Sequence, residues 1–109
     1  MATLRQVLPA APAAEIGALP HNIEAEQQLL GAILINNEVY DKVSSLIRPE
    51  HFFDPVHQRI FEIAVARIQK NALASPVTLK GFLEEDPGLK ELGGPAYLAR
   101  IAGAAISSY

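Results

Sequence analysis

The sequence predicts an all-α protein, a compact bundle of about six short helices preceded by a disordered N-terminal tail. Apolar residues recur at spacings of three and four positions from Asn22 onward, which places them on one face of a helix. Residues of the kinds that begin and end helices separate these apolar runs. No run of four to eight residues alternates between apolar and polar side chains between hairpin turns, so no strand is predicted.

The length and composition of the chain fit one small domain. With 109 residues, of which 50% are hydrophobic, it can bury a core but has little room for two domains. The absence of cysteine excludes disulfides, thiolate zinc sites and cysteine nucleophiles, and it fits a reducing cytoplasm. No stretch approaches the roughly 18 to 20 apolar residues that a membrane helix needs, so we expect no contact with a membrane.

The charge of the chain argues against direct binding to DNA. Nine Lys and Arg residues stand against 12 Asp and Glu residues, which gives a net charge of -3. The basic residues are scattered singly along the chain, so they form no cluster that could neutralise successive phosphates.

Two segments are predicted. Residues 1–19 form an Ala- and Pro-rich tail without a helical stripe, which cannot bury enough surface to offset the entropy of ordering. Residues 20–109 form the helical domain. Its first helix begins at Asn22, whose side chain can accept from the free amides of the first turn, and runs to about Ile35.

The next two helices have clear boundaries. Asn36 and Asn37 end the first helix and can cap a second one, which Pro49 closes. Asp54 and Pro55 begin a third helix over about residues 55–71, because Asp accepts from the following amides and Pro loses no needed hydrogen bond there. The expected apolar stripe of the second helix is Val39 or Tyr40, Val43, Leu46 and Ile47.

Three more helices follow. Thr78 is predicted to cap the fourth, with Val77 and Phe82 as a hydrophobic staple, and this helix ends before Pro87. Gly81 lies inside it, where Ala would be about 1 kcal/mol more favourable. A short fifth element, Leu89 to Leu92, stops at Gly93 and Gly94, and Pro95 opens a sixth helix whose stripe is Tyr97 or Leu98, Ile101 and Ala105.

From these stripes we predict a core of twelve side chains. Its members are the apolar residues on the inward faces of the helices: Leu30, Ile33, Leu34, Val43, Ile47, Ile60, Phe61, Ala64, Ile68, Phe82, Leu98 and Ile101.

The sequence predicts no catalytic, cofactor-binding or metal site. Neither Lys nor Ser or Thr follows Gly93 and Gly94, so they form no phosphate-binding loop and are interpreted as a helix stop. His51, Asp54 and His57 resemble a metal constellation, but the two histidines are six residues apart and do not share a helix face. We therefore favour a loop position for His51 and a first-turn contact with a neighbouring element for His57.

Some side chains allow two interpretations. The acids at residues 84–86 could contact a basic partner, but a solvated helix end is favoured. Phe52 and Phe53 could anchor a partner, although we expect at least one of them in the core. Tyr40 and Tyr97 are expected to have a buried ring and a polar tip that reaches water or a backbone group.

Taken in order, these residues resemble a known family. The segment Leu-Pro-His-Asn-Ile-Glu-Ala-Glu-Gln-Gln-Leu-Leu-Gly-Ala-Ile-Leu at residues 19–34 is followed by His57 with Ile60 and Phe61, by Val-Thr-Leu at 77–79, and by Gly-Gly-x-x-Tyr-Leu at 93–98. Over about residues 19–109 the chain closely resembles the N-terminal domain of the bacterial replicative DNA helicase, the DnaB family.

The resemblance implies a globular six-helix head. In the full-length family protein this head precedes a helical hairpin, a linker and a RecA-like ATPase ring, and the hexamer uses ATP and Mg to unwind duplex DNA at the replication fork. No position of this chain matches the Walker motifs, so the resemblance implies no cofactor here and contact with DNA only through the C-terminal domain.

What the resemblance implies for this part is assembly and protein interaction. Family heads pair with one another in the collar of the hexamer and offer a surface to primase and, in some lineages, to a helicase loader, all in the cytoplasm at the replisome. Two other hypotheses stay open. A freestanding helical adaptor or inhibitor could copy this head, and a hydrolase could use the two histidines with nearby acids, although no nucleophile and base stand at a recognisable spacing.

Overall fold

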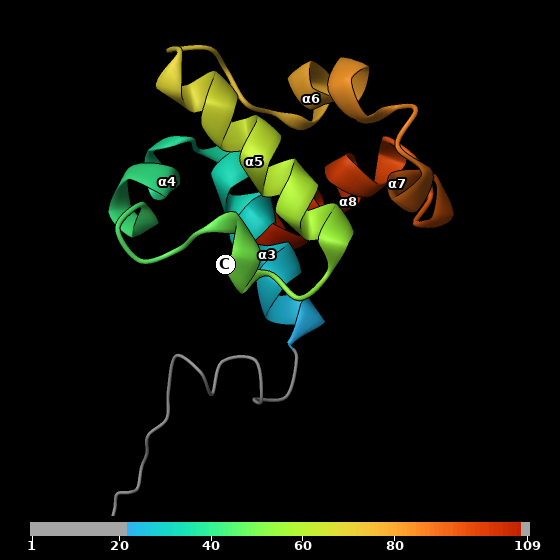
Figure 1. Cartoon of the computed structure of the whole chain (residues 1–109), viewed down its shortest axis with the longest axis horizontal. Coiled ribbons are helices and arrows are strands. Elements are labelled where there is room, and N and C mark those ends of the chain that lie inside the picture. The colour runs from blue at the N-terminus through green and yellow to red at the C-terminus, as the bar shows by residue number, and fades with distance from the viewer. Residues whose placement is uncertain (1–21, 108–109) are drawn as a thin grey trace, which may run out of the picture.

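Six α-helices and one 3-10 helix make up residues 22–107, the part of the chain that this computed structural model describes (Figure 1). No strand occurs within that part, so the all-α prediction is confirmed. The predicted tail, residues 1–19, lies outside the described residues. In chain order the elements are α3 (Ile23–Ile35), α4 (Glu38–Val43), the 3-10 helix η1 (Pro49–His51), α5 (Pro55–Gln69), α6 (Pro76–Leu83), α7 (Pro87–Glu91) and α8 (Ala96–Ser107).

Side-chain caps begin the two longest helices. The Asn22 side chain accepts a hydrogen bond from the Ala25 N–H at 2.9 Å at the start of α3. At the start of α5, Asp54 accepts from the Val56 N–H at 2.8 Å and Pro55 is the first helical residue. Each cap satisfies an amide that has no partner within its helix.

The cap of α6 differs from the predicted one. Ser75 is the N-cap residue, and its hydroxyl accepts from the Thr78 N–H at 3.2 Å while the Thr78 hydroxyl accepts from the Ser75 N–H at 2.8 Å. The helix therefore begins three residues earlier than expected, since Pro76 takes the first helical position. The prediction that Thr78 is the N-cap was wrong.

This earlier start turns the predicted staple outward. Val77 is 82% exposed and Phe82 is 60% exposed, so neither packs into the core and the prediction of Phe82 as a core residue was wrong. Leu79 and Leu83, one turn apart on α6, are buried instead. The physical reason is that a shifted helix start assigns the inward face to a different pair of positions.

Residues with positive φ end α5 and α7. Asn71 has a φ of 60°, and the Ala72 N–H reaches back to the Arg67 carbonyl at 2.9 Å. Gly93 and Gly94 have φ of 115° and 74°, and the Gly94 N–H donates to the Leu89 carbonyl at 2.8 Å. Both ends have the hydrogen bonds of a Schellman motif, in which the left-handed residue closes the helix.

The start of α8 differs by one residue from the prediction. Pro95 lies one residue before α8 rather than at its first position.

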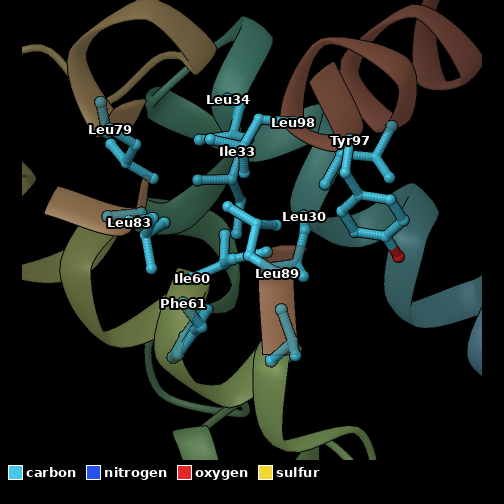
Figure 2. Close-up of a cluster of buried hydrophobic side chains, with 14 of the residues drawn as sticks. Leu30, Ile33, Leu34, Ile60, Phe61, Leu79, Leu83, Leu89, Tyr97 and Leu98 are labelled. Carbon is cyan, nitrogen blue, oxygen red and sulfur yellow. The ribbon is translucent and has the colours of Figure 1, made fainter. Parts of the chain in front are cut away.

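The core lies where α3, α5, α6, α7 and α8 meet, and Figure 2 shows side chains from all five helices pointing into it. Eight of the twelve predicted core residues are buried here: Leu30, Ile33, Leu34, Ile60, Phe61, Ala64, Leu98 and Ile101. Ile47 and Ile68 are partly buried and pack against this cluster. The core also includes Phe52, Val56, Ala74, Leu79, Leu83, Leu89 and Tyr97, which were not in the predicted set.

Helix α4 departs most from the prediction. It has six residues, none of them buried, and Val43 is only half-buried, so the assignment of Val43 to the core was wrong. Leu46 lies beyond the end of α4 and is 68% exposed. The Asn37 side chain does not cap α4. It donates to the Ile33 carbonyl at the end of α3 and binds the backbone of Ala74 through both N–H and C=O. This pair of bonds joins the start of α4 to the segment that precedes α6.

Helices α3 and α8 pack closely and run in the same direction. Gln27 contacts Tyr97 near their N-terminal ends, and Gly31 lies against Ile101 and Ala105 one turn further along both helices. A Cβ atom at Gly31 would collide with the backbone carbonyl of Ile101. Glycine is therefore required at this position for the two backbones to approach.

Candidate functional site

Four polar side chains meet between α3, α5 and α8, and we call Glu26, Gln27, His57 and Tyr97 the polar network. His57, in the first turn of α5, has no exposed side-chain surface. Its Nδ1 lies 2.8 Å from Glu26 Oε1, and its Nε2 lies 2.7 Å from the Tyr97 hydroxyl. The expectation that His57 contacts a neighbouring element is confirmed, and it contacts two.

The hydrogen bonds of the network form one consistent set. Gln27 Nε2 donates to the Tyr97 hydroxyl oxygen at 3.0 Å, which leaves the Tyr97 hydrogen to donate to His57 Nε2. His57 then donates from Nδ1 to the Glu26 carboxylate. Glu26 also accepts from the Phe53 N–H at 2.7 Å, so the same carboxylate holds the segment that leads into α5.

Aromatic packing closes the network. The rings of His57 and Tyr97 are stacked, with centroids 6.0 Å apart and planes 15° apart, and Phe52 lies edge-on to His57 at 6.5 Å. Burial raises the pKa of Tyr97 above its usual value, and the hydrogen bond from Gln27 partly offsets this. The hydroxyl of Tyr97 points away from the apolar cluster, as Figure 2 shows, and it bonds two side chains rather than the water or backbone group that was expected.

The geometry assigns the network a structural role. Both ring nitrogens of His57 are bonded inside the protein, so a substrate would find no free nitrogen on this buried side chain. His51 lies in η1, where its Nδ1 accepts from the Arg48 N–H at 3.1 Å, and Asp54 caps α5. Within residues 22–107, no group of three or more His, Cys, Asp or Glu residues is placed to hold a metal ion.

A second polar contact joins α5 to α7. Arg59 binds the Asp86 carboxylate with two parallel hydrogen bonds, Nε to Oδ1 at 2.5 Å and Nη2 to Oδ2 at 2.8 Å. Asp86 also caps α7 by accepting from the Leu89 N–H at 2.9 Å. The hydrogen bond from Arg59 and the amide of Leu89 lower the pKa of Asp86. Of the three acids expected at a solvated helix end, Glu84 and Glu85 are exposed, whereas Asp86 has this double structural role.

Three of the exposed large apolar side chains, Leu73, Val77 and Phe82, lie in α6 or in the segment between α5 and α6. Phe82 lies next to the C-terminal half of α5, and together they form a groove that we call the α5–α6 groove. Figure 1 shows the chain turning over from the end of α5 to the start of α6 beside it. The residues that line this groove are Ile63, Ala66, Arg67, Lys70, Ala72 and Phe82.

Two further surface features flank the core. A second groove lies between α4 and α5, with Tyr40 and Val65 along it and Arg48 and Glu62 at its edge. Of the adjacent phenylalanines, Phe52 is buried and Phe53 is 54% exposed, so the expectation that at least one lies in the core is confirmed.

The comparison with protein families settles the relationship of the chain. A model of the DnaB-like helicase N-terminal domain matches residues 18–109. The chain belongs to this family.

Individual relatives of this DnaB-like N-terminal domain support the same family assignment. The replicative DNA helicase DnaB of Rickettsia prowazekii (strain Madrid E) is 47% identical over 83 residues, which cover 76% of this chain and 17% of the relative. The corresponding helicase of Buchnera aphidicola subsp. Baizongia pistaciae (strain Bp) is 36% identical over 84 residues, or 77% of this chain and 18% of the relative. The DnaB-like domain therefore spans less than a fifth of the length of these relatives.

A solved structure has the same fold. The crystal structure of the N-terminal domain of DnaB helicase from Mycobacterium tuberculosis matches with a TM-score of 0.69 and 27% identity, covering 77% of this chain and 58% of that chain. None of the helices that the structure describes in this DnaB-like domain is long and apolar enough to cross a membrane.

Proposed function

We propose that this chain is the non-catalytic assembly and docking domain of a replicative DNA helicase that unwinds duplex DNA at the replication fork using ATP. The observation that carries the proposal is the match of residues 18–109 to the DnaB-like N-terminal domain, with 47% identity to a replicative DNA helicase. In this role the domain pairs with other copies in the collar of a hexamer and offers a surface to primase or a helicase loader.

The surface of the domain supports a role in protein contact. Several large apolar side chains are exposed on residues 22–107, and two grooves with apolar floors flank α5. Contiguous apolar surface on a folded domain commonly marks a protein interface. In this proposal ATP and Mg belong to the ATPase region of the helicase, and DNA contacts belong there too. The domain acts in the cytoplasm, at the replisome.

Binding to primase tests the docking role. The 109-residue chain is passed over size-exclusion chromatography with the primase encoded in the same genome, and we expect the two to co-elute. An unrelated acidic protein of similar size, run in place of the 109-residue chain, controls for general stickiness of the primase. Failure to co-elute at high micromolar concentration, with both proteins folded by circular dichroism, would count against the docking role.

Sedimentation tests the assembly role. The mass of the chain is measured by analytical ultracentrifugation, alone and extended by the helical hairpin that follows the head in the family. We expect the extended protein to form a dimer. A monomer in both forms would contradict the assembly role, and a gene that encodes no ATPase segment after this domain would favour the freestanding adaptor or inhibitor instead.

A further inference from the structure

The α5–α6 groove combines an aromatic surface with two cations that have no acidic partner among the described residues. Phe82 is 60% exposed, and Arg67 and Lys70 lie beside it along α5. Neither cation takes part in an ion pair with residues 22–107. The groove therefore presents positive charge to solvent in a chain whose net charge is -3.

Arg67 is held in place before any partner arrives. Its Nε donates to the Leu73 carbonyl at 2.6 Å, and its guanidinium carbon lies 5.6 Å from the centre of the Phe82 ring. The remaining guanidinium nitrogens can donate to another group. A side chain that is already ordered loses less conformational entropy when it binds, which favours recognition of a carboxylate at this point.

Among the described residues that line the groove, none is acidic. Asp86, just beyond the end of α6, pairs with Arg59 in the N-terminal half of α5. Arg67 and Lys70 lie about two to three turns further along the chain, at the C-terminal end of α5. The negative end of the α5 dipole already favours cations there. What distinguishes the groove is that the exposed Phe82 lines it beside these cations.

We infer that the α5–α6 groove docks an acidic amphipathic helix from a partner protein. The apolar face of that helix packs on Phe82 and Ile63, and its carboxylates pair with Arg67 and Lys70. Helix-in-groove binding uses anchors at spacings of three and four residues, which suits a groove between two helices. The inference rests on the proposed docking function and adds to it the chemistry of the partner and the place where it binds.

A designed peptide tests the inference. The probe is a fluorescein-labelled 16-residue helix with Leu at positions 3, 7, 10 and 14 and Glu at positions 4, 8, 11 and 15, and its matched partner has Lys in place of each Glu. Fluorescence anisotropy with the 109-residue chain should show binding of the Glu peptide and weaker binding of the Lys peptide by about tenfold or more.

Three variants locate the site. Lys70→Glu should weaken the Glu peptide about fivefold and strengthen the Lys peptide, and Phe82→Ala should weaken both about tenfold. Lys80→Glu makes the same change of charge on an exposed residue of α6 that does not line the groove, so it should leave both affinities within about twofold. Circular dichroism and thermal unfolding check that each variant is folded.

The outcomes are distinct. The inference is supported if Lys70→Glu shifts the preference of the domain from the Glu peptide to the Lys peptide and Lys80→Glu does not. Equal binding of the two peptides, or equal effects of the two Lys→Glu changes, would overturn it. A dimer of the chain that disappears in Phe82→Ala would also overturn it, because a second copy would then cover the groove. If primase still co-elutes with the Phe82→Ala and Lys70→Glu variants, the proposed docking function holds. In that case only the α5–α6 groove is rejected as the place where docking occurs.

Discussion

Replacing Gly31 by alanine tests the close packing of α3 against α8. An added Cβ would collide with the Ile101 carbonyl oxygen and lie 2.8 Å from the Ile101 carbonyl carbon and 3.1 Å from the Ala105 Cβ. Two of these three atoms are backbone, so no side-chain rotation relieves the clash. Gly81 offers the matched control, because a Cβ added there meets nothing within 4 Å.

The expected magnitudes follow from two opposing terms. Alanine gains up to about 1 kcal/mol of helix propensity over glycine at either position. Overpacking costs about 1 to 3 kcal/mol, and a clash with backbone should fall at the upper end of that range. We therefore expect Gly81→Ala to stabilise the domain by up to about 1 kcal/mol and Gly31→Ala to destabilise it by about 2 kcal/mol.

Urea unfolding of the two variants, followed by circular dichroism, gives the difference directly. It should be about 3 kcal/mol, equal to the packing cost alone because the propensity gain cancels. In thermal unfolding the two midpoints should differ by more than about 10 °C. Equal stability of the two variants would refute the close approach of α3 and α8.

Substitutions at three further positions probe two polar contacts and the left-handed end of α5. Tyr97→Phe should cost about 1 to 3 kcal/mol in urea unfolding, because it leaves the buried Nε2 of His57 without its hydrogen-bond partner. Burial raises the pKa of Tyr97 in the folded state. The unchanged protein should therefore lose stability as the pH rises above about 10 and through the raised pKa. A similar loss in Tyr97→Phe would contradict this. Asp86→Ala should cost about 1 kcal/mol of unfolding free energy through the lost α7 cap. Because the pKa of Asp86 is lowered in the folded state, the difference in stability between the unchanged protein and Asp86→Ala should vanish as the pH falls through that lowered pKa. Asn71→Val should cost about 1 to 2 kcal/mol and Asn71→Gly almost nothing, because the φ of 60° disfavours β-branched side chains. Equal urea-unfolding midpoints of the two variants would contradict the left-handed end of α5.

The parts of the fold that sequence predicts well are those determined by neighbours in the chain. Asn22 and Asp54 cap helices by bonds to amides two or three residues away, so their residue types and positions suffice to predict them. Ser75 shows the limit of this reasoning. Ser75 and Thr78 are both good caps, and each bonds the backbone of the other, so sequence alone leaves two helix starts three residues apart.

The contacts that sequence reasoning missed join residues far apart in the chain. Glu26 fits the first turn of α3 by its charge alone, and nothing near it signals that its carboxylate binds His57, 31 residues away. Asn37 is equally misleading, because an asparagine beside a helix start suggests a cap, whereas its amide binds Ala74 across 37 residues. The α5–α6 groove was missed for a related reason, since the predicted staple placed Phe82 in the core.

The pairing of the first described helix with the last has a consequence for synthesis on the ribosome. Leu30, Ile33 and Leu34 are made early, but the surface that covers them includes α8, which is made after all the other described helices. Until residues 96–107 have left the exit tunnel, part of this apolar face has no intramolecular cover and is open to chaperones or to other nascent chains. This apolar face is therefore fully covered only after α8 has been synthesised.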